Sequence, residues 1–120
     1  MTLTELAQPK DLGVPLVVSV AVDAEAAVVT LRGEADRSTL PVVVDALARA
    51  VAETDGPVIV DLAQTTFIDA GTLRAMARAA DFLDRRGRTL VLRSPSRIAR
   101  RIVDVLDLSC LVERDLVAIA

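Results

Sequence analysis

Residues 58–73 read VIVDLAQTTFIDAGTL and join a buried strand to a helix through an acidic, small-residue turn. The run Val58–Leu62 is nearly all apolar, which is typical of a central strand in a sheet. Asp69 closes the next segment, and the turn at 70–72 leads into a helical pattern that starts at Leu73. The start of a helix offers free backbone N–H groups and a partial positive charge. We therefore expect a docking point for a phosphate or an acidic group at this turn.

The composition describes one domain with an aliphatic core. The chain has 120 residues, of which 52% are hydrophobic and only 2% aromatic. This length is enough for a core, but so few aromatic side chains give little platform for stacking bases or sugars. No apolar run approaches the roughly 18 residues of a membrane span, and the N-terminal residues lack the pattern of a signal peptide. We expect a cytoplasmic protein without membrane insertion.

Enzyme chemistry is disfavoured by the residues that the chain lacks. There is no His, Tyr or Trp, and Cys110 is the single cysteine. Histidine is the commonest general base and a preferred ligand of transition metals. We therefore expect no enzyme activity, no metal and no cofactor. The apolar neighbours of Cys110 predict that its side chain is buried as a small hydrophobe.

The charge is unevenly distributed. The net charge is −3, but residues 74–101 hold nine arginines and two aspartates, a local balance of +7. Either these arginines lie on solvated helix faces, or they form a face for an acidic partner. The negative net charge and the scarce aromatic residues argue against direct nucleic-acid binding.

The pattern along the chain predicts an α/β fold. Residues 1–13 are expected to form a flexible arm and residues 14–120 a single domain. Strands are predicted at 16–22, 28–32, 58–62 and 88–93, with helices after the second, third and fourth of them. The order is β-β-α-β-α-β-α, which implies a mixed, mostly parallel sheet of four or five strands packed with helices. The C-terminal LVERDLVAIA fits either a short strand or a docked tail.

Each predicted helix has an apolar face and a start signal. Ser38 or Thr39 is expected to cap the first helix, and the Ser94-Pro95 pair to start the last. The residues expected to face inward are Leu40, Val43, Val44, Leu47 and Val51 in the first helix, Leu73, Met76, Ala77, Ala80 and Leu83 in the second, and Ile98, Ile102, Val105 and Leu106 in the last.

With these elements placed, residues 14–115 resemble the STAS domain family of bacterial anti-sigma-factor antagonists. Three segments carry the resemblance in the family's order and spacing: TLRGEADRSTLP at 30–41, VIVDLAQTTFIDAGTL at 58–73, and RGRTLVLRSPSRIARRIVDVLDL at 86–108. The resemblance implies a protein that binds an anti-sigma factor of the serine-kinase type and so frees a sigma factor. In that family the kinase phosphorylates a Ser directly after the turn Asp, which adds a charge of about −1.5 to −2 and breaks the complex.

This chain departs from the family at the acceptor. Ala70 follows Asp69, Gly71 comes next, and Thr72 is the nearest hydroxyl. The chain is therefore a constitutively active antagonist, or it uses Thr72 as a displaced phospho-acceptor, or it belongs to a STAS branch with another partner. A hydroxyl near a helix start also commonly caps backbone N–H groups, which gives Thr72 a purely structural role.

The resemblance places the contact surface at residues 66–76, flanked by the loop at 33–39. Asp69 fits equally a partner contact and a helix cap, whereas Asp36 and Glu34 fit loop closure better than partner binding. An accessory subunit of an ABC lipid-transport complex is the alternative function, and a homodimer through the N-terminal hairpin or the Ala75/Ala79 helix face is open. The predicted partner-binding residues are Glu34, Asp36, Phe67, Asp69, Ala70, Gly71, Thr72 and Arg74.

Overall fold

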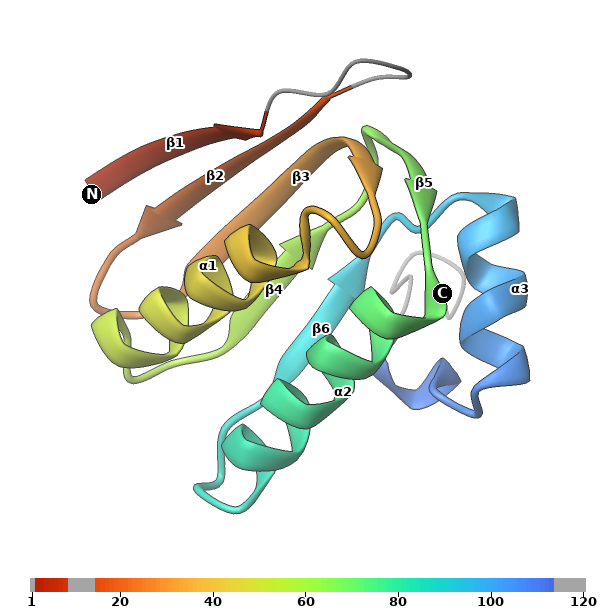
Figure 1. Cartoon of the computed structure of the whole chain (residues 1–120). Coiled ribbons are helices and arrows are strands. Elements are labelled where there is room, and N and C mark those ends of the chain that lie inside the picture. Colours follow the sequence, from red (N-terminus) through yellow and green to blue (C-terminus); the bar gives the residue numbers. More distant parts are fainter. Residues whose placement is uncertain (1, 9–14, 114–120) are drawn as a thin grey trace, which may run out of the picture.

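A six-stranded mixed sheet forms the centre of the computed structural model, which describes residues 2–8 and 15–113 (Figure 1). Its strands are β1 (Thr2–Gln8), β2 (Leu16–Val22), β3 (Ala27–Ala35), β4 (Val58–Asp61), β5 (Thr65–Ile68) and β6 (Leu90–Arg93). The order across the sheet is β1-β2-β3-β4-β6, and β5 pairs separately with the end of β3. The first three strands are antiparallel and the remaining pairs parallel, which confirms the predicted mixed α/β fold.

Two strands were not predicted. The flexible arm expected at 1–13 is wrong for Thr2–Gln8, which pairs along its whole length with β2. The turn region before Asp69 contains β5, a four-residue strand that continues the sheet past the end of β4. Both segments are polar or short, so neither shows the alternation that marks a half-buried strand.

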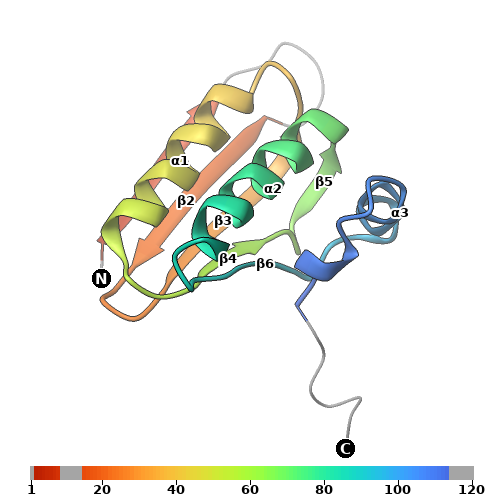
Figure 2. The same cartoon turned by 90° about the horizontal axis from the view of Figure 1, so that it is seen from below.

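Two helices cover one face of the sheet. α1 (Leu40–Glu53) and α2 (Ala70–Asp84) lie side by side on it, whereas α3 (Arg97–Val105) lies beyond β5 (Figure 2). A short 3₁₀ turn, Ser109–Leu111, follows α3. Val112 then pairs with Leu92 of β6, and residues 114–120, with the rest of the predicted strand or docked tail, lie outside the described residues.

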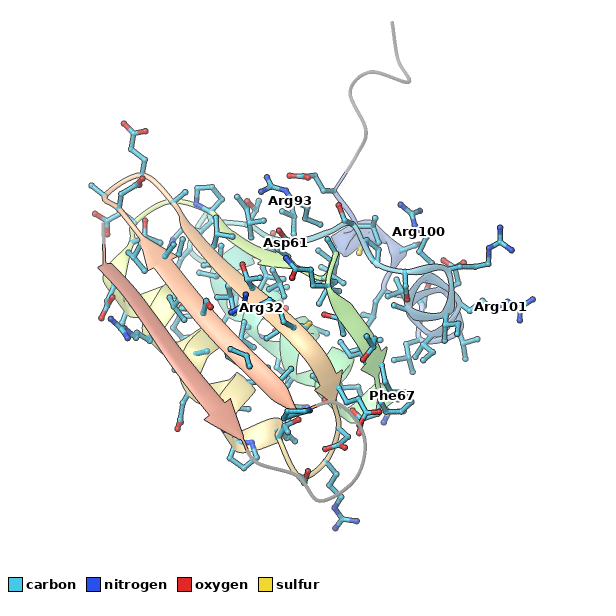
Figure 3. All side chains as sticks on the ribbon, turned by 90° about the horizontal axis from the view of Figure 1, so that it is seen from above. Arg32, Asp61, Phe67, Arg93, Arg100 and Arg101 are labelled. Carbon is cyan, nitrogen blue, oxygen red and sulfur yellow. The ribbon has the colours of Figure 1, made fainter. Side chains whose placement is uncertain are left out.

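The opposite face of the sheet is turned toward the viewer in Figure 3, with α1 and α2 behind it. Along β2, β3, β4 and β6, buried residues alternate with half-buried ones. The half-buried side chains form rows across the strands, one apolar (Ala21, Val28, Ile59 and Val91) and one polar (Ser19, Thr30, Asp61 and Arg93). The core therefore lies between the sheet and the two helices.

Side chains contribute unequally to the two ends of the first helix. Thr39 is its N-cap residue, but the hydroxyl of Thr39 makes no capping hydrogen bond. At the other end Arg88 donates from Nε to the Gly56 carbonyl at 3.1 Å and from its guanidinium to the carbonyls of Val51 and Thr54. A cation at a helix C-terminus satisfies carbonyls that have no partner within the helix. Arg88 thereby ties the start of β6 to the end of α1.

The inward faces of the helices differ in part from the prediction. Val44 is exposed, and Ala46 and Ala50 are buried in its place on α1. In α2, Leu73, Met76 and Leu83 are buried as predicted, but Ala77 and Ala80 are only half-buried.

The inward face of the last helix is only partly as predicted, since Ile102 and Leu106 pack half-buried against the core but the other two residues do not. Ile98 and Val105 are 67% and 83% exposed, while the buried residues are Ala99 and Val103. The helix is capped by Ser96, whose Oγ accepts from the Ala99 N–H at 3.1 Å, rather than by the Ser94-Pro95 pair. The apolar arc of this helix is wide enough to offer two faces, and the smaller side chains pack inward.

The predicted burial of Cys110 is also wrong. The thiol lies on the 3₁₀ turn and is exposed. A turn of three residues has no extended face to bury, so apolar neighbours in the sequence do not fix the direction of this side chain.

Candidate functional site

The pairing of β5 with β3 brings the two predicted loops together. Glu34 lies opposite Phe67 and Ala35 opposite Ile68, after a bulge between Gly33 and Glu34. The Asp69 N–H then donates to the Ala35 carbonyl at 3.1 Å, which fixes the start of α2 against the end of β3. The segments 33–39 and 66–76 are therefore neighbours, as the sequence predicted.

Phe67 is the large apolar side chain at this junction. It is 46% exposed and points away from the core on β5, as Figure 3 shows. Its neighbour Thr65 is buried and anchors the strand, because its hydroxyl donates to the Leu31 carbonyl at 2.8 Å. The hydrogen bond of Thr65 ties β5 to β3, and the Phe67 ring on β5 is exposed to solvent. Glu34 is the residue of β3 that is paired with Phe67.

Asp69 caps the second helix. Its Oδ1 accepts from the Thr72 N–H at 2.8 Å, and α2 begins at Ala70 rather than at Leu73. Ala70, Gly71 and Thr72 are thus the first helical turn and not a separate loop. Gly71 is not required for space, because the nearest atom to a Cβ built there is Asp69 Oδ1 at 3.8 Å.

Thr72 lies inside the molecule. Its side chain is fully buried, and its hydroxyl has no hydrogen-bond partner in the described part of the chain. The predicted capping role of this hydroxyl is therefore wrong, since Asp69 provides the cap. A kinase reaches a hydroxyl only at the surface, so this burial also argues against Thr72 as the displaced phospho-acceptor.

Asp36 closes the loop after β3. Its Oδ1 accepts from the Ser38 N–H at 3.0 Å and from the Ser38 hydroxyl at 2.7 Å. The Asp36 N–H donates to Thr39 Oγ1 at 2.9 Å, which explains why Thr39 does not cap α1 with its side chain. The loop-closing role, favoured from the sequence, is confirmed. Glu34 is half-exposed, and Arg74 is exposed on the second turn of α2.

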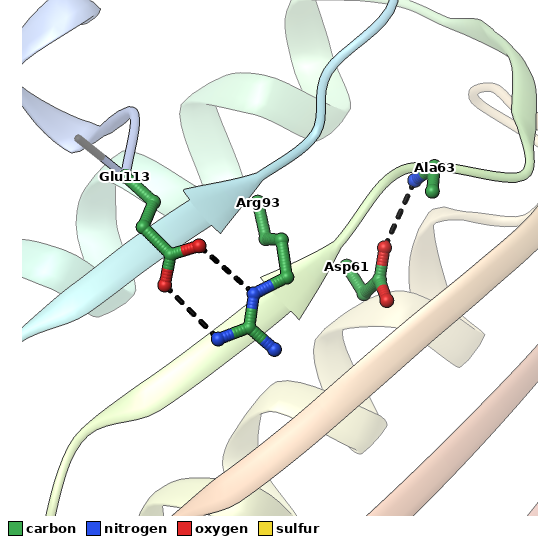
Figure 4. Close-up of polar contacts among 4 residues, drawn as sticks. All are labelled: Asp61, Ala63, Arg93 and Glu113. Carbon is green, nitrogen blue, oxygen red and sulfur yellow. Dashed lines mark hydrogen bonds and ion pairs between the residues drawn. The ribbon is translucent and has the colours of Figure 1, made fainter. Parts of the chain in front are cut away.

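A charged cluster that the sequence analysis missed lies near the ends of β4 and β6 (Figure 4). Arg93 binds Glu113 through two hydrogen bonds, from Nε at 2.9 Å and from Nη2 at 3.0 Å. The Arg93 guanidinium lowers the pKa of Glu113, and the same hydrogen bonds raise the pKa of Arg93. Asp61 Oδ1 accepts from the Ala63 N–H at 3.0 Å. The spacing of 20 residues between Arg93 and Glu113 gave no local signal of this pair.

Two findings limit the chemistry of the described residues. Within 2–8 and 15–113, no group of three or more His, Cys, Asp and Glu side chains is arranged to hold a metal ion. None of the helices in these ranges is both long enough and apolar enough to cross a membrane.

Comparison with known families identifies the fold. A family model described as "Mlab, STAS domain" matches residues 18–113, which is most of the chain. The chain belongs to the STAS family. This agrees with the resemblance found in the three sequence segments.

Solved structures of STAS proteins share the fold of this STAS domain at low sequence identity. The unphosphorylated anti-sigma factor antagonist SpoIIAA has a TM-score of 0.69 and 18% identity, covering 85% of this chain and 92% of its own. The phosphorylated form of the Bacillus cell fate determinant SpoIIAA gives 0.64 and 18%, with 85% and 96% coverage. An anti-sigma factor antagonist from Mycobacterium paratuberculosis gives 0.68 and 19%, with 98% and 90% coverage. No curated protein matches the sequence.

Proposed function

We propose that this STAS domain is a cytoplasmic anti-sigma-factor antagonist that acts by docking on an anti-sigma factor of the serine-kinase type. Its docking surface comprises Glu34, Asp36, Phe67, Asp69, Ala70, Gly71 and Arg74. In this role the protein is a regulatory binding module and not an enzyme. Thr72 is left out of the docking surface because its side chain is fully buried.

The observation that carries the proposal is the exposed ring of Phe67 at the junction of β3, β5 and α2. Glu34 lies opposite Phe67 on β3, and Asp69 follows two residues later at the helix start. An aromatic anchor with a polar surround is the arrangement that dominates binding energy in protein interfaces. The similarity in fold to the anti-sigma factor antagonists supports the choice of partner class.

The proposal includes the loss of the phosphorylation switch. Ala70 is the first residue of α2 and carries no hydroxyl, so a kinase that targets the residue after Asp69 finds no acceptor. The antagonist then stays in its binding state as long as it is present. Its activity is set by its amount rather than by a kinase and a phosphatase.

Partner binding is tested with two matched phenylalanine variants. Phe67→Ala is expected to weaken binding to the kinase-type anti-sigma factor of the source genome by at least about tenfold, as for an interface hot spot. Phe82→Ala is the control, because that ring is 44% exposed on the last turns of α2, far along the helix from the docking surface. Isothermal titration calorimetry measures both. Equal losses in the two variants, or wild-type binding by Phe67→Ala, contradict the docking surface.

The switch is tested by restoring the hydroxyl. Ala70→Ser is expected to take up phosphate from the anti-sigma kinase and ATP, and to lose binding afterwards, whereas the wild type takes up none. Mass spectrometry with peptide mapping locates the phosphate. Negative charge at a helix N-terminus is favourable for the helix, so lost binding reports the interface and not unfolding. Phosphate at Thr72 of the wild-type chain would contradict the proposal that the antagonist is constitutively active.

A second candidate function has support from the family comparison. The matching model is described as "Mlab, STAS domain" and not as a sigma-factor regulator. The chain therefore retains the alternative function of an accessory subunit that docks on the ATPase of an ABC lipid-transport complex. Co-elution with that ATPase, and not with an anti-sigma factor, distinguishes the two candidates.

A further inference from the structure

An apolar groove lies between α1 and α2, open on the side away from the sheet. Its volume is about 650 Å³, and its lining includes Leu47 and Ala75. The rims carry Val44 and Phe82, which are 42% and 44% exposed. The lining residues extend over 44–52 on α1 and 75–82 on α2, and the two helices lie side by side in Figure 2. Two large apolar side chains at solvent on facing helices mark a surface suited to a partner.

The charged side chains that line the groove all have one sign. Its lining contains Arg78, Arg86 and Arg88 and no carboxylate, although the whole chain has a net charge of −3. Arg88 is bound to the carbonyls at the end of α1. Arg86 lies over the Phe82 ring at 3.6 Å and donates to the Phe82 carbonyl at 3.0 Å. Within residues 15–113, Arg78 and Arg86 form no ion pair, so an acidic occupant is favoured.

We propose that this groove binds an amphipathic helix of a partner protein, with an apolar stripe flanked by acidic residues. Arg78 lies on α2, and Arg86 lies in the turn that follows Asp84, the last residue of that helix. Both arginines therefore border the groove on its α2 side. Acidic residues along one edge of the partner's apolar stripe would meet both arginines, because both border the same side of the groove. The apolar side chains of the stripe, spaced three and four residues apart, reach the groove floor, as in other helix-in-groove complexes.

The same observations argue against two other occupants. A second copy of this chain would bring Arg78 and Arg86 of both copies to one interface, where like charges repel. A small amphiphile prefers a site that encloses most of its surface, whereas this groove is open along its outer side. A helix fills such an open groove with one face and leaves its other face in water.

The groove is separate from the docking surface. The docking surface lies at the end of β3, on β5 and at the first two turns of α2 as far as Arg74, whereas the groove is lined on α2 from Ala75 onward and has its aromatic rim near the last turn. Both sites can therefore be occupied at once, and failure of one proposal leaves the other intact.

The test uses a synthetic helical peptide whose apolar stripe consists of leucines at positions i, i+4 and i+7. Two glutamates, two helical turns apart, lie along one edge of this stripe. One Trp is placed outside the stripe. The protein has no Trp or Tyr, so Trp emission reports the peptide alone. The glutamate peptide is expected to bind about tenfold more tightly than a matched lysine peptide, the order expected when two exposed charge pairs are reversed. Added salt should reduce this difference.

Protein variants locate the binding. The double variant Arg78→Glu/Arg86→Glu is expected to reverse the preference, so that the lysine peptide binds more tightly. Its control is Arg100→Glu/Arg101→Glu, which makes the same charge change on exposed residues of α3; both arginines are labelled in Figure 3. The proposal is overturned if both peptides bind equally, if neither binds, or if the α3 variant reverses the preference as well. It is also overturned if sedimentation shows a dimer of the protein that Phe82→Ser abolishes.

Discussion

At the scale of single residues, two buried threonines give opposite expectations for the same substitution. Thr72 is fully buried and its hydroxyl has no partner among the described residues, whereas the Thr65 hydroxyl donates to the Leu31 carbonyl. A buried polar group without a partner costs free energy, while a satisfied one contributes. The Thr72 hydroxyl in the first turn of α2 therefore lowers the stability of the fold, whereas the Thr65 hydroxyl raises it.

Thr72→Val is expected to raise the free energy of unfolding by about 1 kcal/mol, because it replaces an unsatisfied hydroxyl with a methyl group of similar shape. Thr65→Val is expected to lower it by about 1 kcal/mol, because the Leu31 carbonyl loses its donor. Urea denaturation of both variants measures the two changes. A destabilised Thr72→Val variant contradicts the assignment and indicates a partner for that hydroxyl.

Asp69 illustrates why one residue can fit two roles. Its Oδ1 accepts from the Thr72 N–H, so the structural half of its predicted role is confirmed. The Asp69 side chain is also half-exposed at the edge of the docking surface. Its predicted role as a partner contact can be tested only by measuring partner binding. Sequence reasoning could predict an acidic residue at a helix start, but it could not decide which backbone group the carboxylate binds.

At the scale of elements, one side chain determines how α1 meets β6. The Arg88 guanidinium lies among three carbonyls at the C-terminal end of α1, and it is partly buried there. Arg88→Met is expected to lower the free energy of unfolding by about 2 kcal/mol, since charged hydrogen bonds to these carbonyls are lost. Arg85→Met is the control; Arg85 is the C-cap residue of α2 and, among the described residues, its side chain makes only an exposed ion pair with Asp81, so the change is expected to be less than about 0.5 kcal/mol. Thermal or urea unfolding compares them, and equal effects contradict the capping role.

The pair between Arg93 and Glu113 joins the segment after the 3₁₀ turn to β6. Because Arg93 lowers the pKa of Glu113 from its ordinary value of 4.5, the pair contributes stability above that value. The contribution is lost as the pH falls through the lowered pKa of the folded state. Both side chains are more than a third exposed, so the expected effect is local and not global.

An NMR titration of the Glu113 carboxyl is expected to give a midpoint below 4.5 in the wild type. Arg93→Gln should return the midpoint toward the ordinary value, since the neutral amide removes the cation. The Glu113 N–H donates to the Leu92 carbonyl at 2.8 Å, so its exchange rate should rise over the same pH range. A midpoint that Arg93→Gln leaves unchanged shows that another group is responsible.

At the scale of the whole molecule, the sequence predicted the alternating elements of the domain better than their contacts. The apolar run of β4 and the apolar stripe of α2 were clear because their residues are mostly hydrophobic and regularly spaced. β1 was missed because it is an edge strand with many polar residues, and β5 because its sequence TTFI shows no alternation of apolar and polar residues. The adjacency of Glu34 and Phe67 followed from the family resemblance, and only the β3–β5 register shows it in this chain.

The third helix shows the limit of periodicity most clearly. Two apolar faces were available, one with Ile98 and Val105 and one with Ala99 and Val103. The predicted inward residues Ile102 and Leu106 do pack half-buried against the core, but Ile98 and Val105 do not. Hydrophobicity alone favoured the larger residues, whereas Ala99 and Val103 occupy the buried positions, so the prediction was wrong for half of the face.

This unequal packing predicts unequal local stability across the fold. α3 fully buries only Ala99 and Val103, half-buries Ile102 and leaves Ile98 and Val105 at the surface, whereas α1 and α2 bury the core against the sheet. Segments with few buried apolar contacts open with less free energy than the global unfolding reaction. Amide hydrogen exchange should therefore be faster in Arg97–Val105 than in the middle of α1, by at least about tenfold for a difference of 1.4 kcal/mol. The comparison is made by mass spectrometry under native conditions, with the β3 and β4 amides as the slow reference. Equal protection of α3 and α1 would contradict the prediction. It would indicate that another molecule covers the exposed residues Ile98 and Val105 of α3 in solution.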